Sequence, residues 1–310
     1  MSKSNGVFVF QLPGLLKHLT TTTIKMSKLK IAIQKSGRLN QDSLKLLKAC
    51  GIDVNNGKDQ LKVDVQNFPL EILHLRNSDI PQYVEDGVVD VAIVGENLLI
   101  EKEKQITIVE KLGFSKCRVS LAVPKDVGID TLDYFEGKKI ATSYPNTVIS
   151  YLKKNNINAE IHTISGSVEI APNIGLADGI CDIVSSGSTL FKNGLKETQV
   201  ILRSEAVLVK SNKLDNEKEE ILDRLLFRIQ SVLRAKNTKY ILMNVPDSKI
   251  EEVSNILPVL KSPTVLPLAE KGWSSLHSVI EENKFWDIID ELKSVGAEDI
   301  LIIPIDKMVL

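Results

Sequence analysis

The chain has 310 residues, a length that indicates two or three domains, and an apolar content of 43% that is ample for ordinary cores. Its formal net charge is only −1, so no broad basic surface is available to hold nucleic acid or an anionic membrane. No apolar run in the sequence approaches the ~20 residues of a membrane span, and the scattered cysteines Cys50, Cys117 and Cys181 indicate free thiols in a reducing, cytoplasmic compartment.

The predicted elements begin only after residue 27. The segment 6–10 is apolar, but it lacks the small-residue cleavage site of a signal peptide, and four threonines follow it at 20–23. Met26 then precedes a clean strand start at Lys28. We therefore expect residues 1–27 to be a disordered extension, or the product of an upstream start, and leave them out of the fold prediction.

Strands and helices alternate over the first hundred residues. The predicted order is a strand at 29–34, a helix at 41–50, a strand near 70–75, a helix between Asp79 and Gly87 and a strand at 88–94. This alternation indicates an α/β layer with a parallel sheet. Ligands on such sheets bind beyond the carboxyl ends of the strands, where the loops 34–38, 75–79 and 94–96 lie.

A second α/β unit follows the first. Its predicted elements are strands at 117–123 and 138–142, a helix at 146–154, a strand near 160–164, a helix at 168–179, a strand at 181–185 and a returning strand at 200–210. Two lobes joined by strands that cross near 115–125 and 200–210 predict a hinged cleft, as in two-lobed periplasmic binding proteins. We assign 28–118 with 205–230 to the first lobe and 119–204 to the second.

The last segment, 231–310, has a different order of predicted elements from the two lobes. A charged helix from 212 to about 235 leads into it. The predicted order is a strand at 240–245, a helix at 247–257, strands at 263–267 and 274–280, a helix at 283–295 and a strand at 298–304. This βαββαβ order indicates a ferredoxin-like domain. The domain holds no cluster of titratable groups that resembles a catalytic site, so we expect a regulatory or assembly role for it.

The most informative motif follows the predicted strand 180–184. There the chain reads Ser185, Ser186, Gly187, Ser188 and Thr189. Small hydroxyl residues around a glycine allow several backbone N–H groups and hydroxyls to converge on one point, which is typical of a phosphate-binding loop. For this pentapeptide alone, a plain turn with a helix cap is an equally good interpretation.

Two acidic residues lie near this loop in the sequence. Glu169 and Asp182 are hydrogen-bond acceptors of the kind that binds the 2- and 3-hydroxyls of a ribose. Together with the loop, they predict a site for a phosphorylated pentose.

The wider spacing from Glu169 to Leu190 resembles the signature of ATP phosphoribosyltransferases. Further segments resemble the same family: 33–39, 79–81, 86–90, 95–97, 141–145, 166–169 and 262–267. The resemblance covers about 28 to 309 and has no counterpart for 1–27. It implies a two-lobed, periplasmic-binding-protein-like catalytic core with a C-terminal ferredoxin-like regulatory domain.

The resemblance also implies an activity, the first step of histidine biosynthesis. Members join N1 of ATP to the anomeric carbon of phosphoribosyl pyrophosphate, which gives N1-(5-phosphoribosyl)-ATP and pyrophosphate. They use Mg2+, which we expect to be held mainly by the substrate phosphates. The long form is a homo-hexamer, with a dimer as its active unit, and histidine inhibits it through the extra domain.

The resemblance assigns roles to residues of this chain. The phosphoribosyl pyrophosphate site would comprise Asp182, Ser185, Ser186, Gly187, Ser188 and Thr189, and the catalytic set would be Glu169, Asp182, Lys35 and Arg38. The ATP site would comprise Lys35, Gly37, Arg38, Arg76, Gly95, Glu96 and Tyr144. The histidine site would be lined by Asn244, Thr264, Val265 and Leu266.

Most of these assignments have a structural alternative. Lys35 and Arg38 could be solvated charges, Arg76 could pair with Asp79, Glu96 could cap the next helix, Tyr144 could be a packed aromatic, and 264–266 could be a simple strand. The histidines at 74, 162 and 277 are isolated in sequence, which disfavours a zinc site or a catalytic triad.

Two other classes of function compete with the enzyme. One is a sensor that closes on a phosphorylated sugar or nucleotide without chemistry, and the other is a purely structural protein. A second substrate site opposite the phosphate loop, at Lys35 to Arg38 and at Gly95–Glu96, favours the enzyme. Polar residues grouped at strand ends disfavour the structural role.

Overall fold

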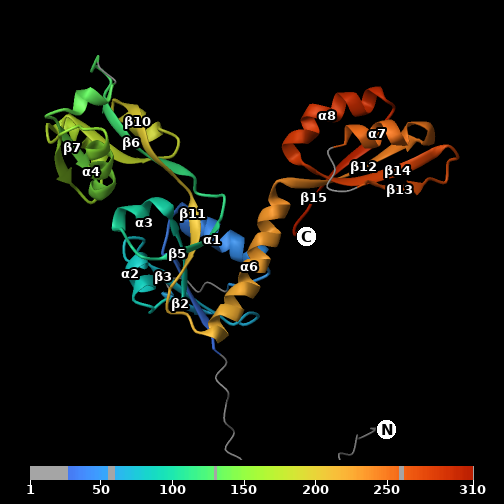
Figure 1. Ribbon diagram of the computed structural model, residues 1–310, viewed down its shortest axis with the longest axis horizontal. Coiled ribbons are helices and arrows are strands. Elements are labelled where there is room, and N and C mark those ends of the chain that lie inside the picture. Colours follow the sequence, from blue (N-terminus) through green and yellow to red (C-terminus); the bar gives the residue numbers. More distant parts are fainter. Residues whose placement is uncertain (1–26, 55–59, 129–130, 258–261, 310) are drawn as a thin grey trace, which may run out of the picture.

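The computed structural model describes residues 27–54, 60–128, 131–257 and 262–309. The expected extension at 1–27 lies outside these residues, except for Ser27. The described chain forms three sheets, and Figure 1 shows two of them in neighbouring lobes and the third in a separate C-terminal domain. None of the described helices is both long and apolar enough to cross a membrane.

The first lobe is built on a six-stranded sheet. Its strand order is β2 (Lys62–Asp64), β3 (Leu70–Leu75), β1 (Leu29–Gln34), β4 (Val91–Gly95), β11 (Ala206–Lys210) and β5 (Thr107–Lys111). The strands β3, β1 and β4 are parallel, as expected. The sheet as a whole is mixed, because β2 pairs antiparallel with β3, and β11 pairs antiparallel with both β4 and β5.

Successive residues of the central strands point to opposite faces of this sheet, and each face is covered. Ile31 and Ile33 pack into a core with α1 (Arg38–Ala49) and α6 (Asn216–Lys236). Ala32 packs into a second core with α2 (Ile80–Glu85) and α3 (Glu96–Lys102). Burial on both faces explains the continuous apolar run in β4.

The second lobe is built on a five-stranded sheet. Its strand order is β10 (Leu195–Ser204), β6 (Cys117–Pro124), β9 (Gly179–Val184), β7 (Lys139–Thr142) and β8 (Glu160–Thr163). Helix α4 (Pro145–Lys154) packs on one face beside the turn η1 (Leu132–Phe135). The short helix α5 (Ser188–Lys192) and two further turns cover the other face.

Several sequence predictions were wrong in this region. The expected helix at 168–179 is two short 3-10 turns, Val168–Ile170 and Pro172–Ile174. Pro172 lacks the N–H that a continuing α-helix needs, and Gly175 has a left-handed φ of 72°, so the chain cannot continue as a helix. The expected strand at 200–210 is two strands, β10 and β11, which belong to different sheets.

The C-terminal domain is an antiparallel sheet with the order β13 (Thr264–Pro267), β14 (Trp273–Glu281), β12 (Thr238–Pro246) and β15 (Glu298–Pro304). Helices α7 (Ile250–Ile256), which follows the turn η4 (Asp247–Lys249), and α8 (Glu282–Ser294) cover one face. This is the ferredoxin-like order that the sequence predicted. We propose that the three sheets mark the two lobes and the regulatory domain set out from the sequence.

Helix α6 connects the first lobe to the C-terminal domain (Figure 1). Its start is fixed by Asp215, whose side chain accepts a hydrogen bond from the Lys218 N–H at 2.9 Å. Ile221, Leu222 and other apolar residues of its first half belong to the core of the first lobe. Near its other end, the Ser231 carbonyl accepts a hydrogen bond from the Met308 N–H.

Candidate functional site

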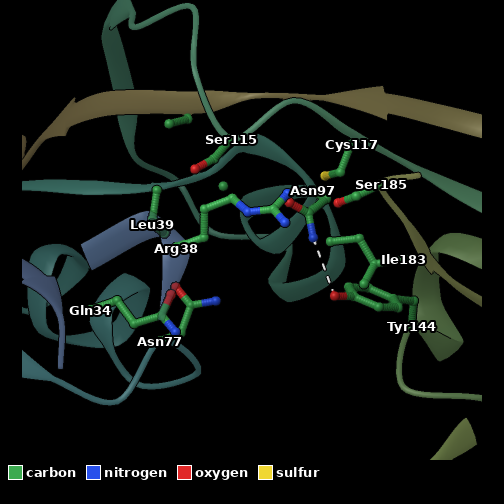
Figure 2. Close-up of a pocket in the computed structure, with 12 residues that line it drawn as sticks. Gln34, Arg38, Leu39, Asn77, Asn97, Ser115, Cys117, Tyr144, Ile183 and Ser185 are labelled. Atoms are coloured by element: carbon green, nitrogen blue, oxygen red, sulfur yellow. Dashed lines mark hydrogen bonds between the residues drawn. The ribbon is translucent and has the colours of Figure 1, made fainter. Parts of the chain in front are cut away.

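A cleft of about 360 Å³ lies between the lobes. Its lining residues come from both lobes and from the connecting strands: Gln34, Arg38, Leu39, Asn77, Gly95, Asn97, Ser115, Cys117, Tyr144, Ile183, Ser185 and Ala206 (Figure 2). Gln34 and Gly95 are the last residues of β1 and β4, and Asn77 follows β3. The cleft therefore lies at the carboxyl ends of the parallel strands, where such sheets bind ligands.

A second cavity of about 370 Å³ contains the predicted phosphate loop. It is lined by Arg38, Glu169 and all the residues from Asp182 to Leu190. Arg38, Ile183 and Ser185 line both cavities, so the two adjoin. The loop 185–189 and the acidic residues Glu169 and Asp182, which are predicted from sequence, thus share one cavity that opens beside the cleft.

The local geometry of the loop leaves donors free for a ligand. Gly187 has a left-handed φ of 80°, which turns the chain directly into α5. The Ser186 and Ser188 hydroxyl oxygens are 3.0 Å apart, and the side chains of Ser185, Ser186, Ser188 and Thr189 are exposed. The first N–H groups of a helix have no partner within that helix. A tetrahedral anion placed here would meet both amide and hydroxyl donors.

The acidic pair carries an electrostatic cost. Burial raises the pKa of the Asp182 carboxyl to about 6, and the charge of Glu169 adds to the rise. Glu169 stands on the first of the two 3-10 turns. A buried acid whose charge is disfavoured in this way is a candidate for a functional site, because a purely structural arrangement gains nothing from it.

Arg118 is a residue of the site that the sequence analysis missed. Its Nη1 donates to the Ser185 carbonyl oxygen at 3.0 Å, and its guanidinium also forms a two-point pair with the carboxylate of Glu197 on β10. Ser120 donates to the same carboxylate at 2.7 Å. The hydrogen bond from Arg118 lowers the pKa of Glu197. Arg118 therefore fixes the start of the phosphate loop to two strands of its sheet.

Only some of the residues predicted to bind ATP line one of the two cavities. Arg38, Gly95 and Tyr144 line the cleft, whereas Lys35, Gly37, Arg76 and Glu96 are not among the residues that line either cavity. The Glu96 side chain lies 3.3 Å from the Lys111 amine, so it makes an ion pair rather than a cap. Among the ion pairs of the described residues, none joins Arg76 to Asp79.

Tyr144 lies on the second-lobe side of the cleft. Its hydroxyl accepts a hydrogen bond from Asn97 Nδ2 at 3.3 Å, which Figure 2 shows as a contact between the two walls. Burial, with the charge of Asp182 adding to it, raises the Tyr144 pKa to about 12. Asn97 belongs to the family-like segment 95–97, but its contact could not be predicted, because it depends on a residue 47 positions away.

The remaining candidates lie away from the cleft. Thr264, Val265 and Leu266 are exposed on the edge strand β13, and Leu266 is aligned through Ser275 with Asn244 on β12. Asn244 donates to the Asp299 carboxylate at 2.9 Å. A histidine site at these residues stays a prediction.

Among the described residues, no cysteine is an activated thiol and no metal cluster is present. Cys50 and Cys181 are buried, and burial raises the pKa of both thiols, to about 11 for Cys50. Within the described part of the chain, no three His, Cys, Asp or Glu side chains are grouped as a metal site.

Known proteins resemble this chain over most of its length. Residues 76–231 match the family model described as ATP phosphoribosyltransferase, and residues 235–307 match the model of the C-terminal domain of HisG. The ATP phosphoribosyltransferase of Cytophaga hutchinsonii is 59% identical over 281 residues, which are 91% of this chain and 98% of that protein. That of Bacteroides thetaiotaomicron is 53% identical and is covered completely.

A solved structure agrees with these sequence matches. A chain of the ATP phosphoribosyl transferase (HisG:HisZ) complex from Thermotoga maritima superposes with a TM-score of 0.58 at 30% identity. The match covers 66% of this chain and 98% of that one. These matches together span the region of the first two sheets and the C-terminal domain, and the chain belongs to the ATP phosphoribosyltransferase family of pentosyltransferases.

Proposed function

We propose that the adjoining cavities bind ATP and phosphoribosyl pyrophosphate together and form N1-(5-phosphoribosyl)-ATP with release of pyrophosphate, at the entry to histidine biosynthesis. One observation carries the proposal: the phosphate loop, the two acidic residues and Arg38 share one cavity, which opens beside a cleft at the ends of three parallel strands. An enzyme with two substrates needs two such adjoining sites.

The sugar phosphate fits the second lobe. The 5-phosphate would be bound by the donors of Ser185 to Thr189, with the positive end of the turn at α5 behind them. The ribose hydroxyls would donate to Glu169 and Asp182. A hydroxyl that donates to Asp182 would stabilise the ionised carboxylate, which burial and then the charge of Glu169 disfavour, so sugar binding and the electrostatics of the cavity support each other.

ATP fits the cleft on the first lobe. Arg38 lines both cavities, so its guanidinium suits the phosphates that lie between the two substrates. Gly95 and Tyr144 would border the adenine. Lys35, Gly37 and Arg76 stand on strand-end loops outside the cavity walls, and we assign them to the outer ATP phosphates. Glu96, the first residue of α3, would complete the ATP site away from the phosphates. Adenine N1 carries no proton, so positioning and charge neutralisation supply most of the rate.

The reaction needs a divalent metal to neutralise pyrophosphate, and we assign Mg2+. This ion is bound in proteins by one or two carboxylates together with substrate phosphates. Glu169 and Asp182 offer such oxygen donors beside the phosphate loop. When bound, the metal would stabilise the charge that develops on the leaving group.

The C-terminal domain suits regulation and assembly. Its second sheet face, opposite the helices, exposes Leu266 (51%), Leu301 (54%) and Ile303 (44%), which indicates an interaction surface. We assign to this domain inhibition by histidine at Asn244 and Thr264 to Leu266, and assembly of a cytoplasmic homo-hexamer whose active unit is a dimer.

The activity is tested directly by mixing the protein with ATP, phosphoribosyl pyrophosphate and Mg2+. The adduct is expected as a rise in ultraviolet absorbance that is stoichiometric with released pyrophosphate, and both should vanish without either substrate. Tight binding of one ligand with no product would instead identify a sensor and reject the proposal.

A further inference from the structure

Glu101 is a buried acid that the proposed substrate contacts do not explain. It lies near the end of α3, is 5% exposed and lines neither cavity. Removal of a carboxylate from water is costly unless hydrogen bonds replace the lost hydration. The groups that supply these bonds therefore indicate what the residue does.

The first turn of α4 binds the Glu101 carboxylate. Oε2 accepts hydrogen bonds from the Thr147 N–H at 2.9 Å and from the Thr147 hydroxyl at 2.7 Å, and Oε1 accepts one from the Asn146 N–H at 3.1 Å. The Asn146 side chain donates in return to the Glu101 backbone carbonyl at 2.9 Å. A negative charge at the start of a helix is stabilised both by these donors and by the helix dipole.

These bonds join the two lobes. Helix α3 follows β4 of the six-stranded sheet, whereas α4 follows β7 of the five-stranded sheet, and Figure 1 shows the two helices in different lobes. Among the described residues, the side-chain hydrogen bonds that pass between the lobes away from the connecting strands all involve Glu101 or Asn97.

Both helices begin at the wall of the cleft. Asn97 lies in the first turn of α3, Tyr144 directly precedes α4, and their side chains meet at 3.3 Å (Figure 2). Asn97 is also fixed by Ser204 at the end of β10, through two bonds of 2.9 Å. Because a helix moves as a stiff unit, the bonds of Glu101 to α4 also set the place of Tyr144 opposite Asn97.

We propose that Glu101 is a positioning residue, which holds the second lobe against the first at the separation that phosphoribosyl transfer requires. The proposal rests on the function proposed above. Arg38 of the first lobe lines the same cavity as the phosphate loop of the second, so the relative placement of the lobes sets the distance between the reacting atoms. A misplacement of about 1 Å lowers the rate of such a reaction about 100-fold.

A positioning role predicts that a change at Glu101 lowers kcat but leaves the affinity for each substrate nearly unchanged. Each substrate is bound mainly by one lobe, so its own affinity should depend little on Glu101. Glu101→Gln keeps the size of the side chain, removes its charge and turns an amide NH2 toward N–H donors. We expect kcat to fall about tenfold or more, while the Kd of each substrate, measured alone by calorimetry, changes less than about twofold.

A second measurement follows the contact itself. Hydrogen exchange of the Asn146 and Thr147 amides, measured by mass spectrometry, should become faster in Glu101→Gln. The matched control is Glu103→Gln, which makes the same charge change at an exposed position at the end of the same helix. The control should retain wild-type kcat, affinities and exchange.

Wild-type kcat in Glu101→Gln would overturn the proposal, as would an equal weakening of both affinities together with the loss of kcat. If that variant does not fold, Thr147→Val can be used, because it removes only the hydroxyl contact. We expect kcat to fall about threefold in this variant, and an unchanged kcat would refute the role. Failure of the proposed function has a different signature, because the wild type would then form no product. Amide exchange would still show whether Glu101 holds α4.

Discussion

Asp182→Asn is expected to make the protein more stable while it removes activity. In the folded protein, burial and the charge of Glu169 raise the Asp182 pKa from 3.8 to about 6. The folded state therefore binds this proton more tightly than the unfolded chain does. It follows that the free energy of unfolding decreases as the pH rises from 3.8 to about 6, and that the full penalty is present above this range.

The size of the effect follows from the shift. One pKa unit corresponds to about 1.4 kcal/mol, so a rise of about two units gives at most about 3 kcal/mol. Asp182 is only partly buried, and solvent screens part of the repulsion, so we expect the variant to gain about 2 kcal/mol at pH 8. The gain should shrink as the pH falls from about 6 to 3.8 and approach zero only below pH 3.8, where the wild-type carboxyl is protonated in both states.

Scanning calorimetry between pH 4 and pH 8 tests this expectation. For lobes of this size, a gain of about 2 kcal/mol raises the Tm by about 4 °C or more at pH 8. Asp133→Asn is the control, since Asp133 is exposed in the η1 turn of the same lobe. A difference in Tm that does not depend on pH, or a less stable variant at pH 8, would show that the cavity does not penalise the charge.

Three further variants test the roles assigned to the phosphate loop, to Arg118 and to the C-terminal domain. Thr189→Val removes a donor of the phosphate loop, so the KM for phosphoribosyl pyrophosphate should rise about tenfold and more than the KM for ATP; equal increases would contradict the assignment. Arg118→Lys loses the hydrogen bond to the Ser185 carbonyl that holds the loop, together with the two-point pair with Glu197, and should raise the same KM about tenfold. The control Arg203→Lys changes the exposed residue opposite Arg118 on β10 and should leave this KM unchanged. Deletion of residues 236–310 should abolish inhibition by histidine, and inhibition that persists in initial-rate assays would place the effector elsewhere.

The fold and the place of the loop 185–189 at the end of a strand could be predicted, because their signals are local. The order of strands and helices follows from hydrophobic periodicity, and the loop at 185–189 is a contiguous motif after a buried strand. The helix predicted at 168–179 was wrong, and the sequence already argued against it, because Pro172 and Gly175 both interrupt helices.

The contacts that fix the site could not be predicted in the same way. Glu101 meets Asn146 and Thr147 only because two sheets place α3 beside α4, and Arg118 reaches Ser185 from 67 positions away. Position at a strand end selected Arg38 and Gly95, which line the cleft, and also Arg76 and Glu96, which line neither cavity. Strand order predicts which loops meet, whereas the direction of each side chain depends on the conformation of its loop.

Helix α6 has a mechanical consequence. Its 21 residues make a rod of about 32 Å that is uninterrupted between the first lobe and the C-terminal domain. One half is embedded in the core beneath β1, and the other half contacts β12 and the chain end near Met308. A continuous helix resists bending far more than a loop does. A tilt of the C-terminal domain would therefore be transmitted through α6 to the sheet whose strand ends form the cleft.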